Sequence, residues 1–154
     1  MCNKSTLPTP DTDTPKTCII QQAHLTDLPA FHEVFDPARP VEVDIGCGKG
    51  RFLLARATAN PGIQFLGIER LLPRVRKIDR KVQRAGLDNV RIIRLEAAYT
   101  LQYFIPEHSV QRFYLLFPDP WPKRRHHKRR LFDEAFRTLL WTRLVPGGEV
   151  QVAT

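Results

Sequence analysis

From residue 41 onward, short apolar runs alternate with segments of helical periodicity. Strands are predicted at residues 41–45, 64–68, 90–95, 110–117 and 149–154. Apolar residues recur every three or four positions, as in helices, at residues 52–57, 71–85, 98–104 and 132–143. Parallel strands need crossover connections of about a dozen residues, which these helices supply. The pattern therefore predicts an α/β protein with a doubly wound, mostly parallel sheet.

The first 40 residues lack this regularity. Residues 1 to 18 are rich in Thr and Pro and show no apolar period, which is typical of a flexible tail. Apolar residues between Leu25 and Phe35 favour one short helix that ends before Pro37. We therefore expect a tail over residues 1–20 and one folded domain over residues 21–154.

Composition narrows the class of protein. The chain has 154 residues, of which 42% are hydrophobic and 26% charged, and no apolar run reaches the roughly 18 residues of a membrane span. The N-terminus also lacks the apolar segment of a secretory signal. Its three cysteines form no C-x-x-C motif, which argues against a disulfide framework or a cysteine zinc site, and we expect Cys47 to be a small filler. These features favour a cytoplasmic protein without a metal or membrane partner.

The net charge of +8 is concentrated in two segments. Residues 70–84 and residues 123–130 each contribute +6, so the rest of the chain is acidic. Concentrated basic segments favour a polyanionic partner such as nucleic acid. The alternative is a pair of solvated charged faces.

Acidic residues follow the predicted strands. In doubly wound sheets, ligands bind beyond the carboxyl ends of the strands, where the strand order reverses. Carboxylates stand at the ends of four consecutive predicted strands: Asp44, Glu69, Glu96 and Asp119. We expect these four side chains to converge on one crevice.

A glycine loop follows the first predicted strand. It has the pattern G-x-G-x-G, formed by Gly46, Gly48 and Gly50. Arg51 stands where the dinucleotide fingerprint G-x-G-x-x-G has its third glycine, and no Walker phosphate loop is present. Glu69 is placed to accept hydrogen bonds from ribose hydroxyls. Together these features favour a nucleoside cofactor without a pyrophosphate, such as S-adenosylmethionine.

The most specific string is FPDPWPKRRHHKRR at residues 117–130. Its three prolines stiffen a turn that presents Asp119 beside Trp121, an arrangement that suits a planar base, and the basic octet that follows can bind phosphates. The alternative is a Pro-rich turn whose Trp packs into the core. His126 and His127 are adjacent, so we expect phosphate or solvent contacts rather than metal binding.

Through this string the sequence resembles the tRNA (guanine-N7-)-methyltransferase family of S-adenosylmethionine-dependent enzymes, over about residues 41–154. The resemblance implies a Rossmann-like methyltransferase sheet and a guanosine target in the variable loop of tRNA. It implies cofactor contacts from Asp44, Gly46, Gly48, Glu69, Glu96 and Asp119. It casts Asp119 as the active-site carboxylate and Lys123 as a substrate contact. It assigns RNA binding to Arg125, His126, His127, Lys128, Arg129 and Arg130.

The sequence departs from this family at three points. Asp44 stands where the family usually has Glu, and Glu96 where it usually has Asp. The family also continues beyond the position of Thr154, so the last two strands of the sheet are expected to be missing and the chain resembles a truncated member. A non-catalytic RNA-binding remnant, or a methyltransferase with another substrate, remains the alternative. The sequence does not indicate an oligomeric state.

Overall fold

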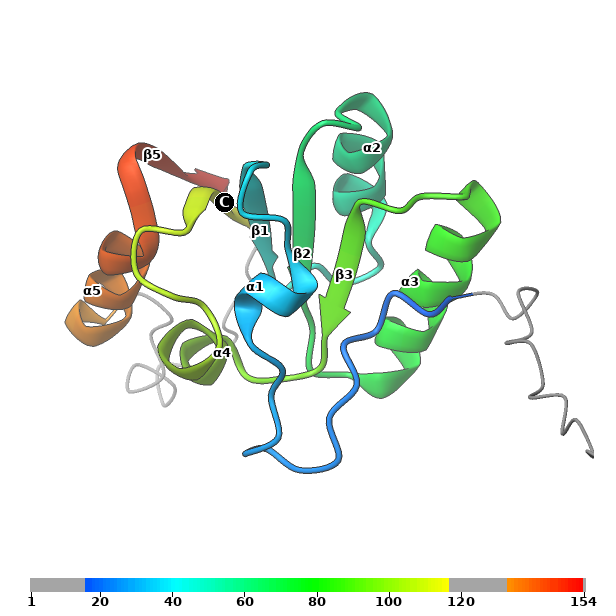
Figure 1. The fold of residues 1–154 in the computed structure, drawn as a ribbon, viewed down its shortest axis with the longest axis horizontal. Coiled ribbons are helices and arrows are strands. Elements are labelled where there is room, and N and C mark those ends of the chain that lie inside the picture. The colour runs from blue at the N-terminus through cyan, green and yellow to red at the C-terminus, as the bar shows by residue number, and fades with distance from the viewer. Residues whose placement is uncertain (1–15, 117–132, 154) are drawn as a thin grey trace, which may run out of the picture.

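The computed structural model describes residues 16–116 and 133–153 (Figure 1). Within these residues, five strands pair in one parallel sheet of order β3-β2-β1-β4-β5. The strands are β1 (Val41–Ile45), β2 (Gln64–Ile68), β3 (Val90–Ile93), β4 (Val110–Leu116) and β5 (Leu144–Ala153). The helices are α1 (Phe31–Val34), α2 (Arg51–Ala59), α3 (Leu72–Ala85), α4 (Ala97–Tyr103) and α5 (Glu134–Arg143). This arrangement confirms the predicted doubly wound parallel fold, and the strand order reverses between β1 and β4.

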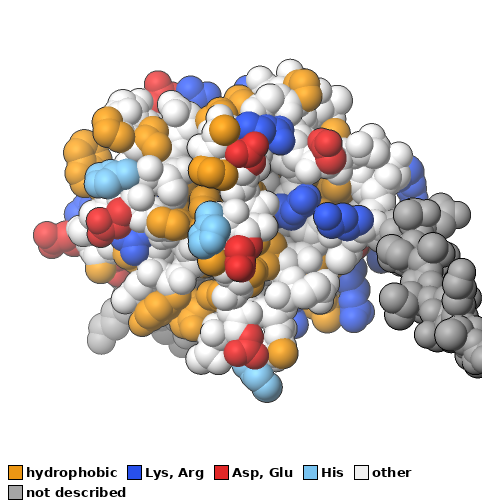
Figure 2. Space-filling view, in the orientation of Figure 1, with side chains coloured by type: hydrophobic (Ala, Val, Ile, Leu, Met, Phe, Trp, Pro, Cys, Tyr) orange, Lys and Arg blue, Asp and Glu red, His pale blue; other side chains and the backbone are white. Residues whose placement is uncertain are grey.

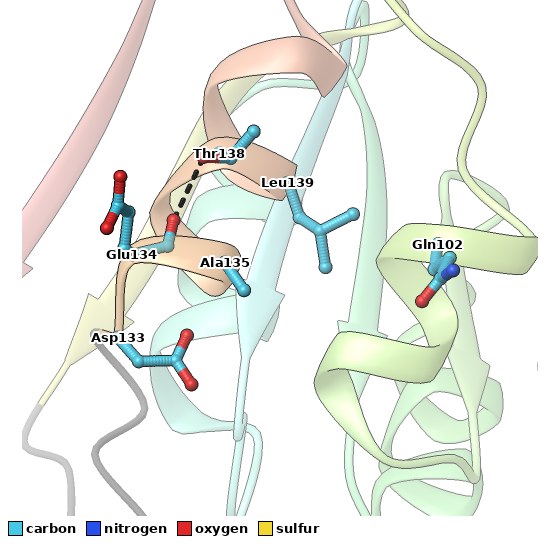
Figure 3. A pocket seen from close by; sticks show the side chains of 6 residues that line it. All are labelled: Gln102, Asp133, Glu134, Ala135, Thr138 and Leu139. Carbon is cyan, nitrogen blue, oxygen red and sulfur yellow. Dashed lines mark hydrogen bonds between the residues drawn. The ribbon is translucent and has the colours of Figure 1, made fainter.

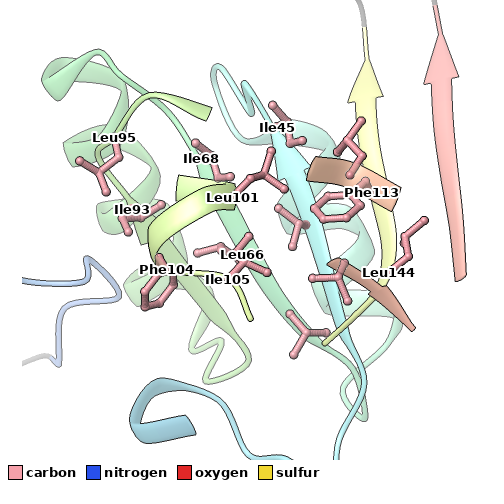
Figure 4. Packing of buried hydrophobic residues seen from close by; sticks show 14 of the residues in the cluster. Ile45, Leu66, Ile68, Ile93, Leu95, Leu101, Phe104, Ile105, Phe113 and Leu144 are labelled. Atoms are coloured by element: carbon pink, nitrogen blue, oxygen red, sulfur yellow. The ribbon is translucent and has the colours of Figure 1, made fainter. Parts of the chain in front are cut away.

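Helices cover both faces of the sheet, with α2 and α3 on one face and α1, α4 and α5 on the other (Figure 1). Successive residues of β2 serve opposite faces, because strand side chains alternate. Phe65 packs with α2 and α3. Leu66 belongs to the cluster on the other face, with residues of α4 and α5 (Figure 4). All five residues of β1 and of β2 are buried, as expected for strands covered on both sides.

The helix α3 follows its sequence pattern closely. Val75, Ile78 and Val82 are at most 2% exposed and pack against β2 and β3. Pro73 lies in the first turn, where its missing N–H costs nothing. Gly86 ends the helix in the left-handed conformation, with φ of 64°. The basic residues of α3 consequently face away from the sheet.

The last strand starts earlier than the sequence predicted. We expected Pro146 to Gly148 to separate α5 from a strand at Glu149, but β5 begins at Leu144 and contains them. Leu144 pairs with Val110 and Glu149 pairs with Arg112, so β5 advances five residues while β4 advances two. A bulge absorbs the three extra residues, which lets the strand tolerate a proline that cannot donate to the ladder. Among the described residues, β5 pairs with β4 alone.

The N-terminal boundary of the folded part also differs from expectation. Ile20 donates its N–H to Ile92 at 2.8 Å, and Ile92 donates to Cys18 at 2.9 Å, so residues 18–20 run beside the outer edge of β3. The Cys18 side chain is 2% exposed. Residues 18–20 therefore belong to the domain rather than to a tail, because their apolar side chains and backbone cover a sheet edge. No helix in the described part is long and apolar enough to cross a bilayer.

Candidate functional site at the carboxyl edge of the sheet

Loops after three strands meet at one edge of the sheet. Gly46 and Cys47, just after β1, donate their N–H groups to the carbonyl oxygen of Ile68 in β2, at 2.9 and 3.1 Å. Glu69, just after β2, donates to Ile93 of β3 at 3.1 Å. The neighbouring strand β4 lies where the strand order reverses. This is the place where doubly wound sheets bind ligands.

The three glycines of the loop have different roles, although all adopt positive φ, between 57° and 73°. A Cβ built on Gly50 would lie 2.8 Å from Cγ1 of Ile78, so Gly50 allows α2 to pack closely on α3. A Cβ on Gly46 would meet nothing within 4 Å. The space beside the Gly46 backbone is thus open, as close approach of a ligand would require, and a ligand contact of the loop stays a prediction.

The N-terminus of α2 adds electrostatic character to this edge. Gly50 occupies the N-cap position and no side chain caps the helix. The first N–H groups of a helix point along its axis and carry partial positive charge. This end of α2 therefore suits an anionic group of a ligand.

Glu69 connects two of the loops. Its side chain is buried, and one carboxylate oxygen accepts from the N–H groups of Arg70 and Leu71, at 2.9 and 3.0 Å. The other accepts from Gly48 at 3.0 Å and lies 3.7 Å from Arg74. Three N–H donors occupy most of a carboxylate's roughly four acceptor positions. The geometry assigns Glu69 to holding the glycine loop against the start of α3, and its contact with a ribose stays a prediction.

Asp44 is buried without a partner among the described residues. Its side chain points to the same face as α2 and lies in register with Gly67 of β2 and Tyr114 of β4. It is 5% exposed, and burial raises the pKa of its carboxyl group to about 7. A buried carboxyl group with a perturbed pKa in a cleft of this kind is a candidate for ligand binding. A cationic ligand group beside Asp44 would supply the missing partner.

Glu96 sits at the N-terminus of α4. It is exposed, and its two carboxylate oxygens accept from the N–H groups of Ala98 and Tyr99, at 3.1 and 2.9 Å. This is the geometry of an N-cap, which stabilises the helix locally. A cofactor contact for Glu96 stays a prediction. The remaining predicted site residues lie outside the described residues: Asp119, Lys123, Arg125, His126, His127, Lys128, Arg129 and Arg130.

Sequence reasoning missed a buried charged group nearer the amino end of β1. Glu42 of β1 is 3% exposed and accepts from Nη2 of Arg56, at 3.0 and 3.1 Å, and from the hydroxyl of Tyr114 at 2.7 Å. Arg112 lies 3.9 Å from Glu42 and 2.8 Å from Glu149 of β5. We call these five residues the Glu42 network. An acid in the middle of a strand expected to be buried was the available signal, because a buried charge requires partners.

A pocket of about 690 Å³ lies on the opposite face, between α4 and α5 (Figure 3). Its lining consists of Gln102, Asp133, Glu134, Ala135, Thr138 and Leu139. Asp133 caps α5 by accepting from the N–H of Phe136 at 2.8 Å. The two acids make this pocket unsuited to a phosphate, and it is separate from the glycine loop. In the described residues, no cluster of His, Cys, Asp or Glu could hold a metal ion.

Curated relatives share one description. A protein of Halorhodospira halophila named tRNA (guanine-N(7)-)-methyltransferase is 42% identical over 121 residues, which cover 79% of this chain and 52% of the relative. A protein of Buchnera aphidicola with the same name is 40% identical over 124 residues, covering 80% of this chain and 51% of the relative. The chain thus spans about half the length of the curated relatives it matches.

Solved structures share the fold. A 30S ribosomal methyltransferase from an uncultured bacterium superposes with a TM-score of 0.60 and 21% identity, covering 86% of this chain and 61% of that one. The YcgJ protein of Bacillus subtilis gives 0.56 and 18%, covering 79% and 47%. Residues 38–154 match the family described as "Putative methyltransferase". Because this match covers most of the chain, the chain belongs to this family of putative methyltransferases.

Proposed function

We propose that this chain transfers a methyl group from S-adenosylmethionine to N7 of a guanosine in the variable loop of tRNA. The main support for this proposal is the similarity, over about four fifths of the chain, to relatives named tRNA (guanine-N(7)-)-methyltransferase. The family match, over residues 38–154, includes both the glycine loop and the string at residues 117–130. The proposed partner is tRNA and the proposed location is the cytoplasm.

The residues at the carboxyl edge fit S-adenosylmethionine as a cofactor. The uncapped N-terminus of α2 suits its carboxylate, and the unpartnered Asp44 suits its positively charged groups. The open backbone at Gly46 allows close approach. When bound, this cofactor supplies a methyl group activated on a sulfonium sulfur. Glu69 holds the loop in place and is proposed to contact the ribose.

The proposed chemistry requires alignment more than acid–base catalysis. Guanine N7 has a free lone pair and carries no proton, so its methylation needs no general base. We assign Asp119 to orienting the base and stabilising the positive charge that develops on the purine. The basic segment from Lys123 to Arg130 is assigned to the surrounding phosphates. The roles of Asp119 and of this segment rest on the sequence.

Labelled methyl transfer tests this proposal. We expect label from S-adenosylmethionine to appear in tRNA as N7-methylguanosine after nuclease digestion. A tRNA transcribed with 7-deazaguanosine, which lacks the N7 lone pair, should accept none. Asp119→Asn should reduce the yield of N7-methylguanosine. Label in the deaza transcript, or at another atom, would contradict the assignment of the target. Salt-dependent tRNA binding without any transfer would favour the non-catalytic alternative.

A further inference from the structure

The outer face of α3 carries cations that no described acid neutralises. Four of them are exposed and have no hydrogen-bond or ion-pair partner within residues 16–116 and 133–153: Arg76, Lys77, Arg80 and Arg84. We call these four residues the α3 cationic face. They lie opposite Val75, Ile78 and Val82, which face the sheet.

This face differs from an ordinary solvated helix surface, on which acids and bases usually alternate at a spacing of four. The one acid of α3, Asp79, turns toward the sheet edge and accepts from the N–H of Cys18 at 2.8 Å and from Gln83 at 2.9 Å. Arg80 instead has Arg76 and Arg84 as its neighbours at that spacing. Like charges so placed repel each other. A polyanion bound along α3 would relieve this repulsion.

The positive surface is continuous with the carboxyl edge of the sheet. The ammonium group of Lys81 donates a hydrogen bond to the carbonyl oxygen of Lys49 in the glycine loop, at 2.9 Å. Arg94, after β3, donates to the carbonyl oxygen of Arg70 at 3.3 Å. Figure 2 shows Lys and Arg side chains on the side of the molecule formed by β3 and α3. A helix of 14 residues extends about 21 Å from that edge.

The shape of this surface favours one class of partner. Its cations are spread along the helix rather than directed at one point, so a small anion could contact few of them. Insertion into a membrane would need exposed apolar residues, but the apolar side of α3 is buried against the sheet. Three of the four cations are arginines, whose planar guanidinium groups pair well with phosphates. These features fit a water-soluble chain of phosphates.

We propose that the α3 cationic face binds the phosphate backbone of RNA. This surface is additional to the segment from Lys123 to Arg130, and it places RNA against α3 as well as at the carboxyl edge of the sheet. The choice of tRNA as the RNA rests on the proposed function, whereas the charge argument does not.

Salt-dependent binding tests the surface directly. The variant Lys77→Gln/Arg80→Gln/Arg84→Gln should lose up to three phosphate contacts. The slope of log affinity for tRNA against log salt, measured between about 50 and 200 mM, should then become shallower by about 2 units, since each contact contributes roughly 0.7 to 0.9. Thermal unfolding of the variant should occur no lower than in the parent, because removing like charges relieves repulsion.

A matched pair of single variants tests whether the loss of any exposed helix cation would change the salt dependence. Arg80→Gln on α3 and Arg137→Gln on α5 each remove one exposed helix cation that has no ion pair among the described residues. Arg80→Gln should reduce the slope by about 0.7 to 0.9, and Arg137→Gln should leave it unchanged. Equal effects of the two would overturn the proposal.

Methyl transfer, measured in parallel, separates this inference from the proposed function. An unchanged salt slope in the triple variant together with N7 methylation would overturn the α3 surface and leave the function intact. A reduced slope without any methyl transfer would support the surface and contradict the function. A variant that loses affinity for anionic vesicles or polyglutamate, but not for tRNA, would also overturn the surface.

Discussion

Two acids lie two residues apart on the same face of β1, and both are almost fully buried. Glu42 accepts hydrogen bonds from Arg56 and Tyr114, so its charge is compensated. Asp44 has no such partner among the described residues, and its pKa rises to about 7. The two residues have nearly equal exposure, 3% and 5%. Their neighbours, rather than their burial, therefore determine their different character.

The contrast separates structure from proposed function. The Glu42 network joins α2 to β1, β4 and β5, since Arg56 belongs to α2 and Glu149 to β5. An edge-to-face contact between the rings of Phe52 and Tyr114, with ring centroids 4.7 Å apart, adds to the same packing of α2 on the sheet. Asp44 contributes no comparable link and weakens the fold when ionised. A costly buried carboxyl group at the ligand edge of a sheet is the pattern expected of a binding residue.

The largest loss of stability should come from removing the charge of Glu42. Glu42→Gln keeps the volume of the side chain but leaves Arg56 and Arg112 without their buried carboxylate. Breaking a buried pair in this way costs about 3 to 5 kcal/mol, and we expect the lower end because both arginines are partly exposed. Urea unfolding at neutral pH measures the change. The exposed Glu107→Gln should stay within about 0.5 kcal/mol of the parent.

Asp44→Asn should act in the opposite direction. The folded-state pKa of about 7 exceeds the ordinary value of 3.8, so ionisation of Asp44 opposes folding. The parent should therefore lose stability as pH rises from about 4 to 7, by up to about 4 kcal/mol for a shift of about three pKa units. The variant lacks this loss and should be the more stable protein at pH 8. If the free energy of unfolding changed with pH by the same amount in both proteins, the raised pKa would not belong to Asp44.

The same substitution should weaken cofactor binding if Asp44 contacts a positively charged group. Loss of a charge-assisted hydrogen bond costs about 1.5 to 3 kcal/mol, or roughly 10-fold to 150-fold in affinity. Parent affinity for S-adenosylmethionine should fall as pH drops below 7, where Asp44 becomes protonated, while the variant should show little pH dependence in that range. Calorimetric titration at pH 6 and pH 8 distinguishes the two. Equal affinities of parent and variant for S-adenosylmethionine at pH 8 would show that Asp44 does not contact the cofactor.

Tyr114→Phe should have the smallest effect. It removes the hydrogen bond to Glu42 and the longer one from Arg112, at 3.4 Å, but keeps the ring contact with Phe52 and leaves Arg56 in place. We expect a loss of about 1 kcal/mol in the free energy of unfolding. In the Glu42→Gln background the same substitution should cost less, because the charged acceptor is already gone. Strictly additive losses in this double-mutant cycle would show that Tyr114 and Glu42 are not coupled.

Much of the fold could be predicted because it depends on local periodicity. β2 occupies residues 64–68, and α3 ends at Gly86, both as expected. The errors occurred where pairing is long-range. Residues 18–20 join the fold through pairing with β3 and through the bond from Cys18 to Asp79 of α3. The strand character of Pro146 to Gly148 depends on a bulge opposite β4. The local sequence pattern of a segment does not specify which strand that segment will pair with.

The candidate site divides in the same way. The sequence by itself determined the approximate positions of the first four strands, the glycine loop and the presence of acids at the strand ends, because alternation, turn-forming residues and charge are properties of short segments. Only the tertiary structure decided what each acid does. Glu69 became a bridge because donors from two loops converge on it, and Glu42 gained its partners from α2, β4 and β5. Asp44 was left alone because no described donor reaches it, and such differences arise only when distant segments of the chain pack together.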